Sequence, residues 1–302
     1  MKYIIIVGDG MADYPVPELG GKTPLEAANT PNLDRLAHGG KMGLIKTVPD
    51  GMEPDSSIAN LSILGYDPQR YYTGRGPLEA GAMGIQFGDR DVAFRCNLVT
   101  VGEGRMVDYS AGHVTNEEAA ELLREVGKLG LGEFFVGVSY RHIFVLRDSE
   151  ISLGCAPPHN IVGEPIASHL IPPEAGEMGK RLNDLMLQSY QLLSSHKVNL
   201  QRQREGKRPA NMIWLWGPGP RPKLEPFQQR YGLRGAMISA VNLINGIGVY
   251  AGMEVIEVPG ATGYYDTNYE GKADHALEAL KRNDFVYVHV DCLLYTSPSP
   301  RD

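Results

Sequence analysis

The sequence is poor in cysteine and has no long apolar run. Only three of its 302 residues are cysteines, and Cys96, Cys155 and Cys292 have neither the even number of a disulfide framework nor the spacing of a metal site. No stretch approaches the roughly 20 apolar residues of a membrane span. Residues 3–7 form an apolar run that is too short for a signal peptide. We therefore expect a cytoplasmic protein without a membrane partner.

A strong excess of basic residues is also missing. The formal net charge is -7, and no stripe of Lys and Arg offsets this acidity. The densest basic run, residues 201–208, follows a helical pattern and is interpreted as a solvated helix end. The composition therefore argues against a nucleic-acid partner, and it does not indicate an oligomeric state.

The beginning of the chain alternates strand and helix signals. Residues 3–7 are apolar and β-branched, which is typical of a strand buried on both faces. Thr23 and Thr30 each precede a proline and predict helix starts, and residues 56–64 predict a further helix that ends at Gly65. This alternation predicts an α/β fold with a mainly parallel sheet flanked by helices.

The middle of the chain has a different pattern of predicted strands and helices. Residues 91–101 and 133–147 are predicted to be strands, and residues 115–129 are predicted to form an amphipathic helix capped by Thr115. Two strands around one helix indicate a smaller α+β domain, residues 85–170, inserted into the larger sheet.

Strand and helix alternation resumes after one long predicted helix at residues 174–205. The remaining predicted elements are strands at residues 211–216, 254–258 and 285–290, a helix that starts at Ser239, and a helix at residues 269–281. Residues 1–84 and 171–291 are therefore assigned to the core domain.

The last residues, 292–302, break this pattern. A buried strand at residues 285–290 should be followed by a catalytic loop and further periodic elements. The chain instead continues with a Ser/Pro-rich segment that predicts no such element. We interpret this segment as a non-native tail that resembles an out-of-frame or adapter-derived sequence.

Two short motifs carry candidate chemistry. Asp9 follows the first predicted strand between two glycines, where a carboxylate can approach a divalent cation. Ser56 lies in the first turn of a predicted helix, where the helix dipole and free N–H groups can stabilise a phosphoryl group and an ionised hydroxyl. Each motif alone also fits a simpler role, a turn for Asp9 and a helix N-cap for Asp55 or Ser56.

Together with their surroundings these motifs are more specific. The sequence resembles the archaeal-type cofactor-independent phosphoglycerate mutases of the alkaline phosphatase superfamily, and the resemblance covers residues 1–290. It is carried by GDGM at 8–11, TPLEAA at 23–28, TPNLD at 30–34, ANLSILGYDP at 59–68, YYTGRGP at 71–77, DYSAGH at 108–113, YRH at 140–142, PHNI at 158–161, WGPG at 216–219, GLRG at 232–235 and PGATG at 259–263.

The resemblance implies a mechanism with two divalent metal ions (manganese, or magnesium or zinc) and without 2,3-bisphosphoglycerate. Ser56 takes the phosphoryl group from 3-phosphoglycerate and returns it to the other hydroxyl, which gives 2-phosphoglycerate. Asp9 and Ser56 are the metal ligands that the resemblance assigns. The family usually has an acidic residue after its nucleophile, whereas this chain has Ser57, which stays a second candidate.

The resemblance also assigns substrate binding partly to the inserted domain. Phosphoglycerate is an anion, so Arg and His are its expected donors. The candidates are Arg95, His113, Arg141 and His159, with Arg234 of the core domain and with Asp108 as an acid/base helper.

The other metal ligands of the family lie in an Asp-Glu-Ala-Gly-His stretch after the strand matched by residues 285–290, and further on. Here Asp291 falls near that place, but no ligand pair follows it. We therefore expect a C-terminally truncated mutase that is inactive as this chain. Two alternatives stay open, namely a metal-dependent phosphohydrolase or phosphonate-processing enzyme of the same superfamily, and a non-catalytic binding protein.

Overall fold

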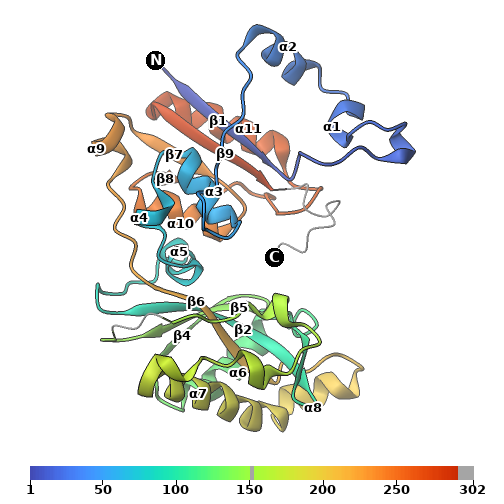
Figure 1. Ribbon diagram of the computed structural model, residues 1–302, viewed down its shortest axis with the longest axis vertical. Coiled ribbons are helices and arrows are strands. Elements are labelled where there is room, and N and C mark those ends of the chain that lie inside the picture. Colours follow the sequence, from blue (N-terminus) through green and yellow to red (C-terminus); the bar gives the residue numbers. More distant parts are fainter. Residues whose placement is uncertain (150–152, 292–302) are drawn as a thin grey trace. The chain divides into compact units, whose positions relative to one another are not determined.

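The computed structural model describes residues 1–149 and 153–291, so the predicted tail at 292–302 lies outside the described residues. The chain forms two compact units. We call residues 1–72 together with the chain from Leu224 onwards the terminal unit, and Thr73–Lys223 the middle unit (Figure 1).

The terminal unit is built on a four-stranded parallel sheet with the order β1-β9-β7-β8. Its strands are β1 (Tyr3–Asp9), β7 (Gly235–Ile238), β8 (Glu254–Val255) and β9 (Phe285–Asp291). Its helices are α1 (Pro24–Ala27), α2 (Pro31–Gly39), α3 (Ser56–Ile63), α4 (Pro68–Tyr71), α9 (Phe227–Tyr231), α10 (Asn242–Tyr250) and α11 (Tyr269–Arg282), with a 3-10 turn at Pro17–Leu19.

Alternation along β9 separates the two faces of this sheet. Val286 and Val288 join a buried cluster with Ala276 and Ala279 of α11. Tyr287 and His289 therefore point to the other face, because successive side chains of a strand alternate. Helix α10 packs on β7 and β8, and α3 packs against α10.

The middle unit contains an antiparallel sheet with β2 (Val92–Gly102) at its centre. Strand β2 pairs with β3 (Arg105–Asp108), β5 (Arg141–Leu146) and β6 (Met212–Pro220), and β5 pairs with β4 (Glu133–Val138). The helices are α5 (Arg75–Ala82), α6 (Asn116–Gly127), α7 (Gly176–Ser194) and α8 (Lys197–Arg204), with 3-10 turns at Pro158–Ile161, Ile166–His169 and Pro173–Ala175.

Both faces of this antiparallel sheet are covered. Phe94 and Phe144 belong to the main core, which includes residues of α6 and α7. Their strand neighbours Ala93 and Ile143 belong to a second buried cluster with Ala80 of α5. Strand β2 is consequently buried along almost its whole length, like a strand in the middle layer of a three-layer unit.

The predicted α/β fold class is confirmed: a parallel sheet flanked by helices is accompanied by a second, α+β region. The helices expected near residues 23, 30, 56, 115 and 269 are present. Thr23 and Thr115 each form a complete capping box, with Glu26 and Glu118 respectively.

Three details of the sequence prediction are wrong. Residues 211–216 were expected in the parallel sheet, but β6 pairs antiparallel with β2. Residues 133–147 form the hairpin of β4 and β5, with Ser139 at a positive φ of 55° in the turn. The predicted helix at 174–205 is divided into α7 and α8, because the side chain of His196 accepts a hydrogen bond from Val198 N–H and caps a new helix.

The extent of the middle unit also differs from the predicted inserted domain at residues 85–170. The compact unit begins at Thr73 and continues to Lys223, because α5 packs on β2 and α7 packs on β6. These contacts join residues far apart in the sequence, so local periodicity does not reveal them.

No helix in the described part of the chain is long and apolar enough to cross a membrane.

The capping box of α6 provides a test of this local structure. Thr115 Oγ1 accepts from Glu118 N–H, while Glu118 accepts from Thr115 N–H at 3.0 Å. Replacing Thr115 by Ala removes the side-chain acceptor and should lower the free energy of unfolding by about 1 kcal/mol. Urea unfolding measures the change. Thr115→Ser keeps the hydroxyl and should be close to the unaltered protein, so an equal loss in both variants contradicts the capping role.

Candidate active site

The carboxyl ends of β1 and β9 bring two acidic residues side by side. The parallel register pairs Asp9 with Asp291. His289, two residues earlier on β9, places its Nε2 atom 3.4 Å from Oδ2 of Asp9. The Asp9 side chain is 29% exposed, so its carboxylate is accessible from solvent at this edge of the sheet.

His289 is itself buried, with 1% of its surface exposed. Its Nδ1 atom lies 3.4 Å from Ser239 Oγ, and its backbone carbonyl accepts a hydrogen bond of 3.2 Å from Lys272 Nζ. Ser239, the residue after β7, and Lys272 of α11 thus hold the end of β9 that faces Asp9.

The first turn of α3 presents Ser56. Asp55 is the N-cap, and its Oδ1 atom accepts from the N–H of Ser57 at 2.8 Å and from the Ser57 hydroxyl. Ser57 is completely buried, whereas Ser56 is partly exposed. Of the two serines, Ser56 is therefore the one that a ligand in solvent can reach.

A buried hydrogen-bonded chain connects this turn with β9. The Asn60 side chain donates to the Ser56 carbonyl at 2.8 Å and accepts from the hydroxyl of Tyr287. Tyr287 is fully buried, and burial, together with the charge of Asp9, raises the pKa of its hydroxyl. Tyr287 consequently stays protonated and acts as a donor to Asn60.

The middle unit holds a second group of predicted residues, around the ring of Trp216. The Arg75 and Arg95 guanidinium groups lie 5.3 and 4.9 Å from the centre of this ring, a distance typical of cation–π contacts. The Trp216 N–H donates to Asn97 Oδ1 at 3.0 Å, which fixes the ring. The imidazole of His159 meets the ring edge-to-face at 5.4 Å.

Two tyrosines extend this group towards the surface. Tyr109 contacts His159 at 6.0 Å between ring centres and Tyr140 at 5.8 Å. Tyr140 in turn contacts His113 at 5.9 Å, and the Arg141 guanidinium lies 5.7 Å from its ring centre. The structure therefore brings together four predicted residues: Arg95, His113, Arg141 and His159. We call these four, with Arg75, Tyr109, Tyr140 and Trp216, the cationic–aromatic cluster.

Arg95 is the innermost cation of the cluster. It is 5% exposed and forms a buried ion pair with Glu79 of α5. Burial lowers the pKa of Arg95, Glu79 opposes this effect, and Arg75 and Arg141 add to it. The repulsion shows that three guanidinium groups share one small region, which favours an anionic ligand.

Asp108 adjoins this cluster at the end of β3. Its Oδ1 atom accepts from Ser110 N–H at 2.8 Å and from Ser110 Oγ at 2.7 Å, and its Oδ2 atom accepts from Gly112 N–H at 2.9 Å and from Arg208 at 2.9 Å. Burial disfavours the charged form of Asp108, but these hydrogen bonds hold the pKa of its carboxyl below its usual range.

Within the terminal unit, Arg234 lies at the opposite end of the parallel sheet from Asp9. It precedes β7 and contacts Asp284, the residue before β9, at 3.4 Å. Both positions lie at the amino ends of the parallel strands, whereas Asp9 lies at the carboxyl end of β1.

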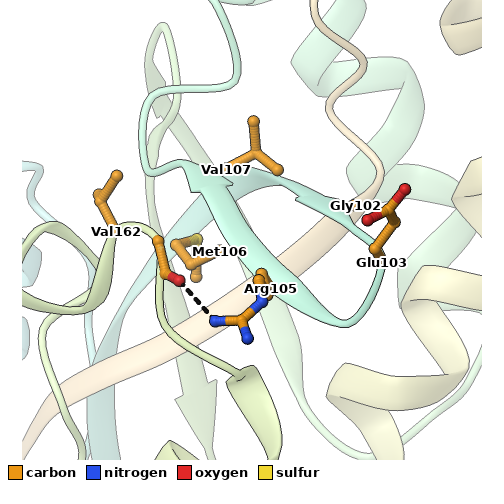
Figure 2. Close-up of a pocket in the computed structure, with 7 residues that line it drawn as sticks. Gly102, Glu103, Arg105, Met106, Val107 and Val162 are labelled. Atoms are coloured by element: carbon orange, nitrogen blue, oxygen red, sulfur yellow. Dashed lines mark hydrogen bonds between the residues drawn. The ribbon is translucent and has the colours of Figure 1, made fainter.

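A shallow hollow of the middle unit lies elsewhere, beside the β2–β3 turn (Figure 2). It is lined by Gly102, Glu103, Arg105, Met106, Val107, Val162 and Gly163, and Arg105 donates to the Gly163 carbonyl at 2.9 Å. None of the predicted site residues lines it.

Within residues 1–149 and 153–291, no three His, Cys, Asp or Glu side chains gather into a cluster that could hold a metal ion. Asp9 is an accessible carboxylate and hence a suitable single ligand. The described residues alone do not make a complete two-metal site.

The terminal unit carries an acidic strand end and a partly exposed serine in a first helical turn, and the middle unit carries a cluster of cations, features that suit an anionic ligand. Comparison with known proteins identifies the class more closely. Residues 37–199 match the family model of 2,3-bisphosphoglycerate-independent phosphoglycerate mutase.

Individual relatives cover nearly all of the chain. A 2,3-bisphosphoglycerate-independent phosphoglycerate mutase 2 of Methanothermobacter thermautotrophicus is 56% identical over 294 residues, which are 96% of this chain and 72% of the relative. A solved structure from Pyrococcus horikoshii has a TM-score of 0.77 at 30% sequence identity. The superposition covers 96% of this chain and 70% of the Pyrococcus chain. The cofactor-independent phosphoglycerate mutase of Thermoplasma acidophilum has a TM-score of 0.59 at 32% sequence identity. Here the superposition covers 96% of this chain and 77% of the Thermoplasma chain.

The chain therefore belongs to the 2,3-bisphosphoglycerate-independent phosphoglycerate mutase family. The resemblance drawn from its motifs is confirmed.

The sequence analysis did not select several residues of these two groups. His289 is hidden in an apolar strand, and only the β1–β9 register places it against Asp9. Trp216 and Arg75 lie in motifs that match the family, but their contact with each other depends on the packing of α5 on β6. No motif or predicted element singled out Glu79, which lies in α5 in the structure.

The buried side chain of His142 makes the free energy of unfolding depend on pH. Burial and then the charge of Arg95 lower its pKa to about 3, whereas an unfolded histidine titrates near about 6.5. Between these values only the unfolded chain binds the proton. The free energy of unfolding should therefore fall as the pH decreases below about 6.5, by up to about 1.4 kcal/mol per pH unit. Urea unfolding at several pH values measures this slope.

A matched pair of variants isolates the contribution of His142. His142→Asn removes the titrating group and should flatten the slope, whereas His38→Gln changes an exposed histidine and should leave it unchanged. An undiminished slope in His142→Asn would show that other groups cause the pH dependence.

Proposed function

We propose that this protein interconverts 3-phosphoglycerate and 2-phosphoglycerate without 2,3-bisphosphoglycerate, and that Ser56 carries the phosphoryl group between the two hydroxyls. The observation that carries this proposal is the family relationship over 96% of the chain, which includes the turn that presents Ser56. A phosphoserine route explains why no phosphorylated cofactor is needed.

The proposed reaction has two displacements. The Ser56 oxygen attacks phosphorus, the bond from phosphorus to the 3-oxygen of the substrate breaks, and the proton lost by Ser56 is balanced by one gained at the 3-oxygen. After the glycerate has turned, its 2-oxygen attacks the phosphoserine, the bond from phosphorus to Ser56 breaks, and the proton lost by the 2-hydroxyl is balanced by one gained at Ser56. Neither water nor a redox partner is consumed, so the overall reaction is an isomerisation.

The geometry of α3 supports Ser56 as the nucleophile. Its hydroxyl is partly exposed in the first helical turn, where N–H groups and the helix dipole favour a negative phosphoryl group. The Ser57 hydroxyl is buried and donates to Asp55. Asp55 thus supplies an acidic group on one side of Ser56, although the chain lacks the acidic residue that the family has on the other side.

We further propose that divalent metal ions, manganese or magnesium or zinc, assist this reaction, with Asp9 and Ser56 as ligands. A bound metal would favour the ionised hydroxyl of Ser56. Since the described residues supply too few ligands for a complete site, we derive no step that passes through a metal.

The cationic–aromatic cluster is the proposed site for the anionic substrate. Arg141 and His113 are exposed and His159 is partly exposed, so these three can donate hydrogen bonds to a phosphate or carboxylate. Buried Arg95 would act mainly through its positive charge.

The acid/base role of Asp108 stays a prediction, as does the cytoplasmic location. The substrate-binding role of Arg234, which contacts Asp284, stays a prediction as well.

The nucleophile is tested in the full-length gene product, supplied with Mn²⁺ and no 2,3-bisphosphoglycerate. This enzyme should convert 3-phosphoglycerate into 2-phosphoglycerate, which a coupled enolase assay detects. Ser56→Ala should abolish conversion, because no other exposed hydroxyl lies in this helical turn.

Ser57→Ala is the matched control and should keep activity within about tenfold, because it removes only a cap contact. Loss of activity in Ser57→Ala but not in Ser56→Ala would assign the nucleophile to Ser57. Release of inorganic phosphate at a comparable rate would instead support a phosphohydrolase.

Substrate binding can be measured on the 302-residue chain itself by titration calorimetry with 3-phosphoglycerate. Arg141→Met should weaken binding by about tenfold, because a charged hydrogen bond is lost. Arg124→Met changes an exposed arginine of α6 and serves as the control. Equal affinities of the Arg141→Met variant and the unaltered chain would exclude Arg141 from the site.

A further inference from the structure

The turn between β3 and α6 has an unusual backbone. Ala111, Gly112 and His113 are consecutive and have φ angles of 49°, 59° and 52°. Only glycine adopts this left-handed region without a steric penalty, so two of the three residues are strained. Strained turns persist only where the surrounding structure holds them, and they are concentrated at functional sites.

One support of this turn comes from Asp108. Its carboxylate accepts from Ser110 N–H at 2.8 Å and from Gly112 N–H at 2.9 Å, and the turn is closed by His113 N–H donating to the Ser110 carbonyl at 2.9 Å. These bonds fix the N–H groups of the turn but leave its carbonyl groups to other partners.

Arg202 of α8 binds those carbonyl groups. Its side chain is 2% exposed, and Nη2 donates to the carbonyls of Ala111 at 2.8 Å and Gly112 at 3.3 Å. Nε donates to the Arg208 carbonyl at 2.9 Å. Nη1 lies 2.5 Å from a carboxylate oxygen of Glu118, which compensates the buried charge. The planar guanidinium has several N–H groups in fixed directions, so it can donate to all of these oxygens at once. The ammonium group of a lysine, on a flexible stem, cannot do so.

The turn determines where His113 lies. The His113 ring contacts Tyr140 edge-to-face at 5.9 Å, and Arg141 lies over the same tyrosine at 5.7 Å. A change in the backbone at residues 111–113 would therefore separate the imidazole from the guanidinium. The spacing of these two donors decides whether both can bind one anion.

We propose that Arg202 is a positioning residue for phosphoglycerate, which holds the strained turn in the conformation that presents His113 to the cationic–aromatic cluster. This inference rests on the proposed function of that cluster. Arg202 does not touch the substrate but acts through the Ala111 and Gly112 carbonyls.

The experiment compares Arg202→Lys with the unaltered 302-residue chain. Calorimetry with 3-phosphoglycerate should show about tenfold weaker binding, because one ammonium cannot replace the bonds to both carbonyls. Arg204→Lys makes the same change at an exposed position of α8 and should leave the affinity unchanged. Circular dichroism and thermal unfolding report whether each variant is folded.

A spectroscopic readout separates positioning from general destabilisation. The imidazole NMR signals of His113 should move in Arg202→Lys because the ring leaves Tyr140, whereas those of His159, beside Trp216, should stay. Ala111→Gly removes strain from the turn and, combined with Arg202→Lys, should recover part of the lost affinity.

Unchanged affinity and unchanged His113 signals in Arg202→Lys would overturn the inference and leave the proposed function intact. If the unaltered chain does not bind 3-phosphoglycerate, substrate binding by the cluster fails and the role of Arg202 in it fails too. Parallel shifts of the His113 and His159 signals would also overturn the inference, since they would indicate a general loss of packing.

Discussion

The parallel pairing of β1 with β9 is the constraint on which the terminal unit depends. It joins the first strand of the chain to the last described strand, residue by residue from Tyr3 with Phe285 to Asp9 with Asp291. A shift of one residue would turn Tyr287 and His289 towards α11 and Val286 and Val288 towards the candidate site. The burial of these valines against α11 therefore also places the polar groups that surround Asp9.

The same pairing explains how two distant motifs become one site. Tyr287 of β9 donates to Asn60 of α3, and Asn60 holds the carbonyl of Ser56. The position of the exposed serine is thus tied to the sheet that carries Asp9, through buried hydrogen bonds whose partners would be costly to leave unsatisfied. A serine on such a buried support suits the nucleophilic role proposed for Ser56, because positioning of the reacting atom lowers the cost of the reaction.

Local signals in the sequence predicted much of the terminal unit and less of the middle unit. Helix starts at Thr23 and Thr115 are visible because a capping box is formed within four residues. The pairing of β2 with β6 is not visible, because it joins residues more than a hundred positions apart and an isolated strand does not specify its partner. Arg95 was predicted as a candidate donor to an anion, whereas its partner Glu79 was not, because their ion pair depends on the packing of α5 on β2. Charged candidates were easier to select from the sequence than the residues that hold them in place.

The cationic–aromatic cluster illustrates why such supports are necessary. Arg75, Arg95 and Arg141 raise one another's electrostatic energy, and this repulsion opposes the folding of the middle unit. The ion pair with Glu79 compensates Arg95, and the face of the Trp216 ring offers Arg75 and Arg95 a favourable cation–π contact. A carboxylate in place of this ring would compete with an anionic ligand, whereas the aromatic ring leaves the positive potential in place. A bound anion would then relieve the remaining repulsion, so binding and folding of this unit favour each other.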